Sequence, residues 1–269
     1  KDVLLGPGVN IYRTPLCGRN FEYMGEDPYL ASEMVVPYIK GVQEQGVAAC
    51  VKHYALNNEE QHRHTVDVSL SDRALREIYL PAFKAAVMKG DAWAIMGSYN
   101  KYQGTYACHN HRLLVEILKE EWGFDGAVIS DWGGVHSTEE AIYNGLDMEF
   151  GTWTDGLREG ASNAYDSYYM ALPYLELIES GEVGTKELDD KVRRVLRLTF
   201  RTAMNNDKPY GAMCSEEHSI AARQIAEEFF AQHDTRATTG EIALTWAGDV
   251  FGEASASGSM LNTSLMYIY

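Results

Sequence analysis

Short apolar runs alternate along most of the chain with longer segments whose apolar residues recur at helical spacing. Residues 46–54 are of the first kind, because the run Gly-Val-Ala-Ala-Cys-Val ends in polar residues, as a buried strand does. Residues 71–89 are of the second kind, since Leu75, Ile78 and Phe83 share one helical face behind Ser71, a good N-cap. The predicted strands are 1–9, 46–54, 93–99, 126–131 and 146–150, and the predicted helices are 34–44, 71–89, 112–122, 135–144, 165–180 and 185–200.

This alternation of strands and helices is typical of parallel βαβ units. About five strands are predicted, whereas a closed (β/α)8 barrel needs eight. We therefore expect an α/β fold of the TIM-barrel type that is incomplete in this chain, with missing strands that could lie upstream of Lys1. Residues 1–203 would form the partial barrel and 204–228 a helical linker, while 229–269 stay unassigned and could begin a second α/β domain.

Composition excludes several classes of protein. With 39 acidic and 23 basic residues the net charge is −16, so phosphate backbones would repel the chain and nucleic acid is not an expected partner. No apolar run approaches the length of a membrane span, and the four scattered cysteines suit neither a disulfide framework nor a zinc site. The chain starts at Lys1 without an initiator Met, as a processed or truncated product would, and the compartment (cytoplasmic, periplasmic or secreted) stays open.

Polar side chains end the predicted strands. Lys52 and His53 end the second strand, Tyr99 ends the third, and Asp131 with Trp132 ends the fourth. In α/β barrels the carboxyl ends of the strands meet at one rim. A carboxylate, a cation, an imidazole, a phenol and an indole at one rim suit a sugar, and a carboxylate beneath an anomeric carbon can stabilise an oxocarbenium-like centre. Alternatively, Asp131 could merely cap the following helix.

Several linked motifs occur in one order, among them Gly-Arg-Asn-Phe-Glu at 18–22, Lys-His at 52–53 and Ser-Asp-Trp at 130–132. Over residues 2–228 the chain resembles the β-glucosidases of glycoside hydrolase family 3. The resemblance rests on segments 6–28, 51–63, 73–83, 95–100, 113–132 and 145–151. It implies hydrolysis of terminal β-D-glucosyl residues with retention of configuration, without cofactor or metal.

The same resemblance implies roles for individual residues. Asp131 would be the nucleophile that forms a covalent glycosyl-enzyme, and the acid/base would come from a second domain outside the assigned region. The sugar-binding residues would be Arg19, Lys52, His53, Arg63, Met96, Tyr99 and Trp132. The partners would be β-glucoside oligosaccharides or aryl glucosides, with no nucleic acid or membrane, and the chain could form a homo-oligomer or associate with the rest of the enzyme.

Each role has an alternative. Lys52 could be an internal ion-pair donor, Arg19 could brace its loop through Glu22, Glu26 or Asp27, and Met96 could be a core residue. The His62/His64 and His109/His111 pairs could suggest a metal-dependent hydrolase instead. The chain could also be a non-catalytic carbohydrate-binding fragment, or a β-xylosidase of the same family, although that branch tends to have Cys where Trp132 stands.

Overall fold

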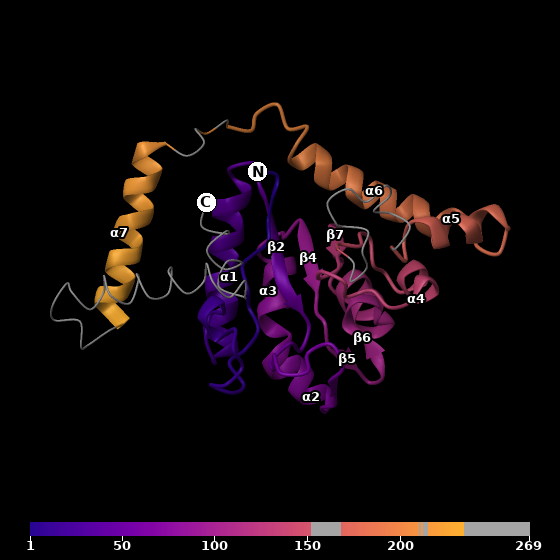
Figure 1. Cartoon of the computed structure of the whole chain (residues 1–269), viewed down its shortest axis with the longest axis horizontal. Helices are drawn as coiled ribbons and strands as arrows, with labels where there is room; N and C mark the ends of the chain where they lie inside the picture. The colour runs from indigo at the N-terminus through magenta and orange to yellow at the C-terminus, as the bar shows by residue number, and fades with distance from the viewer. Residues whose placement is uncertain (152–167, 210, 212–214, 234–269) are drawn as a thin grey trace, which may run out of the picture. The chain divides into compact units, whose positions relative to one another are not determined.

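A parallel sheet organises the first of two compact units, Lys1–Pro209 and Tyr210–Tyr269. The computed structural model describes residues 1–151, 168–209, 211 and 215–233. The sheet has the order β1 (Val3–Leu4), β2 (Ala48–Tyr54), β4 (Ala94–Gly97) and β7 (Ala127–Ile129), and each adjacent pair is parallel (Figure 1). Met148 adds a single parallel bridge to Ile129. The predicted α/β class with a parallel sheet is therefore confirmed, and the described residues do not form a closed barrel.

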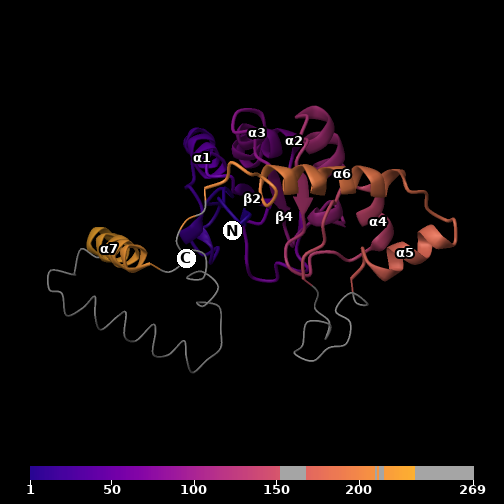
Figure 2. The same cartoon turned by 90° about the horizontal axis from the view of Figure 1, so that it is seen from above.

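Helices pack on one face of this sheet. Figure 2 shows α1 (Pro28–Gln43), α2 (Asp72–Ala74) and α3 (Pro81–Met88) on the same side of β2 and β4. Asp27 caps α1 by accepting the Tyr29 N–H at 2.8 Å, a cap that was not predicted. Ser71 caps α2 through the Ala74 N–H at 3.2 Å, as predicted. The other helices that the structure describes in this unit are η1 (Asn20–Glu22), η2 (Leu75–Tyr79), η3 (Ala107–His109), η4 (Arg112–Glu121), α4 (Thr138–Tyr143), α5 (Leu172–Glu179) and α6 (Lys186–Arg201).

Alternate residues of each strand enter two different cores, because side chains point to opposite faces of a sheet. Val51, Ile95 and Val128 belong to the large core beneath the helices. Cys50, Met96 and Ile129 form a smaller cluster that also includes Ala94, with Leu5, Met148 and Phe150 packed against it. The strands therefore present apolar residues on both faces, as strands buried on both sides do.

The structure differs from the predicted elements mainly in their ends. Helix α1 begins at Pro28 rather than at residue 34, because the Asp27 cap lies upstream of the apolar pattern. The predicted strand 146–150 is reduced to the single bridge at Met148. A second sheet of β3 (Asp67–Val68), β5 (Lys101–Tyr102) and β6 (Thr105–Tyr106) was not predicted, since two-residue strands are too short to show a period.

Two predicted segments reach beyond the described residues. The helix predicted over 165–180 is observed as α5 from Leu172, and 165–167 lie outside the described part. In the second unit the structure describes the helix α7 (Glu216–His233), which includes 229–233 of the unassigned segment 229–269, and residues 234–269 lie outside the described part. Among the helices that the structure describes, none combines the length and apolarity needed to cross a lipid bilayer.

Candidate active site

The carboxyl ends of the parallel strands bring the predicted residues together. Lys52 and His53 belong to β2, Tyr99 follows β4, and Asp131 follows β7 by two residues. The carboxylate of Asp131 is buried, and its Oδ2 lies 3.7 Å from Nε2 of His53. Its Oδ1 accepts the Trp132 N–H at 2.8 Å. Asp131 thus contacts the end of β2, which lies two positions from β7 in the sheet, as the barrel-type arrangement predicts.

Opposing effects act on the Asp131 carboxyl. Burial raises its pKa above the ordinary value, while the Trp132 N–H, the Arg19 guanidinium and the Tyr99 hydroxyl act to lower it. Burial prevails, so the net shift is upward. The Asp131 carboxylate is therefore less solvated than an aspartate in water, and positive groups nearby partly compensate for the lost solvation.

His53 is held rigidly and in its neutral form. Its backbone N–H donates to Oδ1 of Asn10 at 2.7 Å, and its carbonyl accepts from Nδ2 of the same Asn10 at 2.9 Å. The ring Nδ1 lies 3.0 Å from the Tyr23 hydroxyl. Burial, together with the positive charges of Arg19 and Lys52, lowers the pKa of His53 well below its ordinary value. The imidazole therefore offers one donor and one acceptor without a charge.

One carboxylate, Glu22, joins two of the predicted cations. Its Oε1 lies 2.5 Å from Nε of Arg19 and its Oε2 lies 2.8 Å from Nζ of Lys52. Burial raises the pKa of Glu22, but Arg19 and Lys52 outweigh burial and the net shift is downward. Glu22 therefore stays ionised and sets the positions of both cations.

A second carboxylate, Glu60, continues this network. Glu60 lies 2.6 Å from Nη1 of Arg63 and 3.8 Å from Nη1 of Arg19, and it accepts from Nδ2 of Asn57 at 2.8 Å. The Arg63 guanidinium in turn lies 4.5 Å from the ring centroid of Tyr99. Arg19, Arg63 and Tyr99 are thereby linked, through a cation–π contact and a shared anion.

The structure also places the remaining predicted residues. Met96 is only 2% exposed and packs in the cluster with Cys50 and Ile129, on the sheet face opposite the helices. Trp132 is 46% exposed, and its ring contacts Phe150 edge-on with centroids 5.3 Å apart. Trp132 can thus offer an indole face to a ligand, while Met96 lies behind the surface.

Sequence reasoning missed three residues of this network. Glu22 was considered only as a brace for Arg19, whereas Glu60 and Tyr23 were not considered at all. All three lie inside the motif segments 6–28 and 51–63, so the signal was their proximity in sequence to Arg19, Lys52 and Arg63. Their partners lie on other loops and strands, and only the fold shows those contacts.

His109 and His111 contact different carboxylates. His109 pairs with Glu140 at 2.7 Å, whereas His111 pairs with Glu116 at 3.3 Å. Within the described ranges, no group of three or more His, Cys, Asp or Glu side chains is arranged to hold a metal ion.

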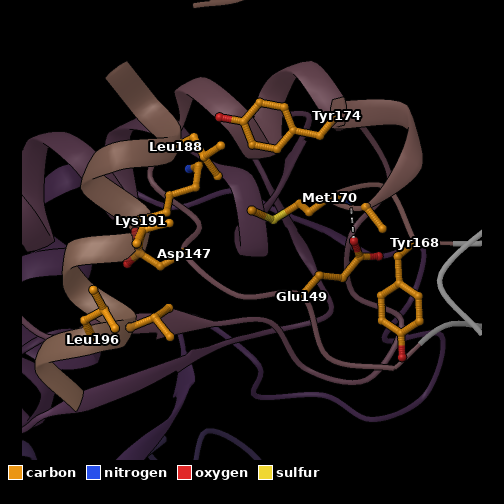
Figure 3. A pocket seen from close by; sticks show the side chains of 11 residues that line it. Asp147, Glu149, Tyr168, Met170, Tyr174, Leu188, Lys191 and Leu196 are labelled. Atoms are coloured by element: carbon orange, nitrogen blue, oxygen red, sulfur yellow. Dashed lines mark hydrogen bonds between the residues drawn. The ribbon is translucent and has the colours of Figure 1, made fainter. Parts of the chain in front are cut away.

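A cavity of about 350 Å³ lies between the segment 147–149 and helices α5 and α6 (Figure 3). It is not lined by the residues predicted to attack or bind the sugar, namely Arg19, Lys52, His53, Arg63, Met96, Tyr99, Asp131 and Trp132. The Glu149 carboxylate accepts the Met170 N–H at 2.7 Å, and Lys191 donates to the Ala141 carbonyl at 3.1 Å. Burial lowers the pKa of Lys191 to about 8. The polar groups of this cavity are engaged with the backbone, so we assign it to helix packing rather than to the sugar site.

Comparisons with known proteins agree with one another. The family model of the glycosyl hydrolase family 3 N terminal domain matches residues 2–198. Beta-glucosidase BoGH3A of Bacteroides ovatus is 63% identical over 228 residues, which are 85% of this chain and 30% of that protein. Thermostable beta-glucosidase B of Acetivibrio thermocellus is 44% identical over 226 residues, 84% of this chain and 28% of that protein.

Solved structures give the same result. The structure of beta-glucosidase 3B from Thermotoga neapolitana in complex with alpha-D-glucose superposes with a TM-score of 0.71 at 39% sequence identity, covering 84% of this chain and 31% of that one. The chain thus spans less than a third of the length of these relatives.

Proposed function

Because the chain belongs to glycosyl hydrolase family 3, we propose that it provides the nucleophile and the sugar-binding side chains of a retaining β-glucosidase acting on terminal non-reducing β-D-glucosyl residues. One observation carries this proposal. Asp131 lies buried at a strand end, 3.7 Å from a neutral His53, and a network of three cations and two further carboxylates surrounds the pair. β-Glucoside oligosaccharides and aryl glucosides are the proposed substrates.

In the proposed first step, the Asp131 carboxylate attacks the anomeric carbon as the bond to the leaving oxygen breaks and that oxygen takes a proton from a general acid. In the second step, a water attacks the same carbon, gives its proton to the group that served as acid, and releases Asp131 as a carboxylate. Two inversions give net retention.

The side chains around Asp131 suit a polyol. Lys52 and Arg19 carry several N–H donors that Glu22 fixes in place, and His53 offers its Nε2, since its Nδ1 contacts the Tyr23 hydroxyl. Charge-assisted bonds from such groups to sugar hydroxyls are strong and directional. The exposed indole of Trp132 offers the apolar surface that a pyranose face requires.

The general acid is proposed to lie outside the residues described. A general acid must hold its proton near neutral pH, so its pKa has to be raised. The shift of Glu22 is downward, and Glu60 is bound by Arg63 and approached by Arg19. Both carboxylates are therefore suited to holding cations and unsuited to giving a proton.

Trapping the glycosyl-enzyme tests the proposal. 2,4-Dinitrophenyl 2-deoxy-2-fluoro-β-D-glucoside carries a leaving group that needs little protonation, so trapping does not depend on the general acid. We expect one fluoroglucosyl adduct on the peptide that contains Asp131, no adduct with Asp131→Asn, and normal labelling with Asp125→Asn, a matched change at an exposed aspartate.

Three results would count against the proposal. An adduct that persists in Asp131→Asn would place the nucleophile elsewhere. Absence of any adduct, in a chain that is folded by circular dichroism, would favour a non-catalytic carbohydrate-binding role. Faster trapping by the corresponding 2-fluoroxyloside would favour a β-xylosidase.

A further inference from the structure

The short helix η3 (Ala107–His109) lies between the end of β4 and the loop that carries Asp131. Cys108 donates its thiol to the Ser98 carbonyl at 3.3 Å, directly before Tyr99. On the other side, a Cβ added at Gly134 would lie 2.8 Å from Sγ of Cys108, so the loop passes in close contact with the sulfur. η3 is therefore wedged between two strand ends that carry proposed site residues.

His109, the last residue of η3, binds this loop through its ring. Its Nε2 accepts the backbone N–H of His136 at 3.2 Å, and its Nδ1 lies 2.7 Å from Oε2 of Glu140. An Nε2 that accepts a hydrogen bond carries no proton, so the proton of the neutral ring sits on Nδ1, the nitrogen close to Glu140. The side chain is only 1% exposed, and burial lowers the pKa of His109 to about 4, in keeping with a neutral ring.

The loop 131–136 is held at further points that His109 complements. The Gly133 N–H donates to the Phe150 carbonyl at 3.0 Å, and the Gly134 N–H donates to the Asp131 carbonyl at 3.0 Å. The His136 ring stacks on Tyr106 with centroids 3.8 Å apart. Asp131 begins this loop and His136 ends it, so the His109 bond sets the far end of the segment that aims the Asp131 carboxylate.

We propose that His109 is a positioning residue: its neutral Nδ1–H tautomer holds the 131–136 loop through the His136 N–H, and so fixes the direction of Asp131. The catalytic part of this proposal rests on the proposed function, and the structural part does not. Nothing in the role requires His109 to touch the substrate, and its burial beneath the loop keeps it away from solvent.

A matched pair of substitutions isolates the acceptor. The oxygen of Gln can take the place of Nε2, so His109→Gln can keep the bond to the His136 N–H. The amide of Asn reaches only the place of Nδ1, so His109→Asn can keep the contact with Glu140 and loses the hydrogen bond to the His136 N–H. His111→Asn, on the exposed neighbour, controls for a change of histidine in the same segment.

Hydrogen exchange and trapping are measured on the whole chain. We expect His109→Asn to raise the rate of amide exchange in the peptide covering 131–136 by about tenfold, as expected for the loss of one buried hydrogen bond. The same change should slow trapping by the fluoroglucoside about ten- to a hundredfold. His109→Gln and His111→Asn should stay within about twofold of the unchanged chain in both measurements. Nitrogen-15 shifts of the unchanged chain should show the proton on Nδ1 of His109.

The outcomes separate the two proposals. Equal effects of His109→Asn and His109→Gln, no effect of either, or a proton on Nε2 would overturn the positioning role. If the unchanged chain is never labelled by the fluoroglucoside, the proposed function is refuted. If exchange in 131–136 still rises with His109→Asn and not with His109→Gln, the anchoring of the loop by His109 stands.

Discussion

Replacing Glu22 by Gln tests how the cations at the strand ends are held. Glu22 is the shared anion of Arg19 and Lys52, with oxygen–nitrogen distances of 2.5 and 2.8 Å. The Glu22 side chain is 20% exposed and that of Lys52 is 8% exposed, so water can solvate little of the positive charge that the substitution leaves unpaired. Gln keeps the shape and one acceptor oxygen, and removes the negative charge.

The expected loss follows from these contacts. A hydrogen bond to a charged group contributes about 1.5–3 kcal/mol, and removing one partner of a buried pair destabilises by about 3–5 kcal/mol. Since Gln can still accept from one cation, we expect the free energy of unfolding to fall by about 2–4 kcal/mol. The free energy of unfolding of a typical domain is about 5–15 kcal/mol, so the variant should remain folded.

Urea unfolding, followed by circular dichroism, measures this loss. The matched control is Glu33→Gln, which breaks the 3.5 Å pair with Lys89 at a side chain that is 51% exposed, and should change stability by less than about 1 kcal/mol. The pKa of Glu22 is lowered in the folded chain, so its charge stabilises above the ordinary value of 4.5 and that contribution is lost as the pH falls through the folded pKa. The deficit of Glu22→Gln should therefore shrink in acid.

Two results would refute this reasoning. One is a deficit no larger than that of Glu33→Gln, and the other is a deficit that persists unchanged at low pH. Combining Glu22→Gln with Lys52→Met gives a further check, because removing both charges should destabilise less than the two single changes added together.

Other predictions concern the sheet and its edges. Asp147→Asn should destabilise by about 3–5 kcal/mol in urea unfolding, because this buried carboxylate accepts the Val128 N–H and pairs with a lysine, each at 2.8 Å; a loss below 1 kcal/mol would contradict this. Gly97→Ala should destabilise by about 1–3 kcal/mol, because the new methyl would lie 2.8 Å from the buried sulfur of Cys108. Gly41→Ala, which has open space inside helix α1, should stabilise by about 0.5–1 kcal/mol. Thermal melts that rank the two variants in the opposite order would contradict both predictions. Burial lowers the pKa of His53 in the folded chain, so the unfolded chain binds a proton more readily and stability should fall as the pH drops below 6.5. His53→Gln should reduce that fall. An identical dependence of stability on pH in the variant would argue against a neutral ring.

The sequence predicted the parts of the fold that repeat. Strands β2, β4 and β7 lie in short apolar runs that end in Lys-His, Tyr and Asp-Trp, and their parallel pairing follows from the helices between them. Because the carboxyl ends of parallel strands meet at one edge, the sequence also predicted that His53 lies near Asp131, and the observed distance between Nε2 and Oδ2 is 3.7 Å. A period of two residues in a strand and a common sheet edge were sufficient for these results.

Other features depend on contacts that no local pattern encodes. Glu22 and Glu60 occupy polar loops, where a carboxylate gives no sign of which cation it will bind. In the sheet of β3, β5 and β6, β3 pairs with β5 more than thirty residues away, and all three strands are too short for periodicity. Met148 lies in an apolar stretch that predicts a strand, yet in that stretch only Met148 forms a β-bridge, with Ile129.

The pairing of Asn10 with the backbone of His53 has a consequence for sequence variation. The Asn10 amide pairs with this backbone as a neighbouring strand would. Its Nδ2 donates to the His53 carbonyl at 2.9 Å, and its Oδ1 accepts the His53 N–H at 2.7 Å. Aspartate has the reach but lacks the hydrogen, serine and threonine have a single oxygen closer to the backbone, and glutamine is one methylene too long. In a library of all twenty amino acids at position 10, selection for a folded chain should therefore retain asparagine and deplete every other residue, including those that chemists regard as similar.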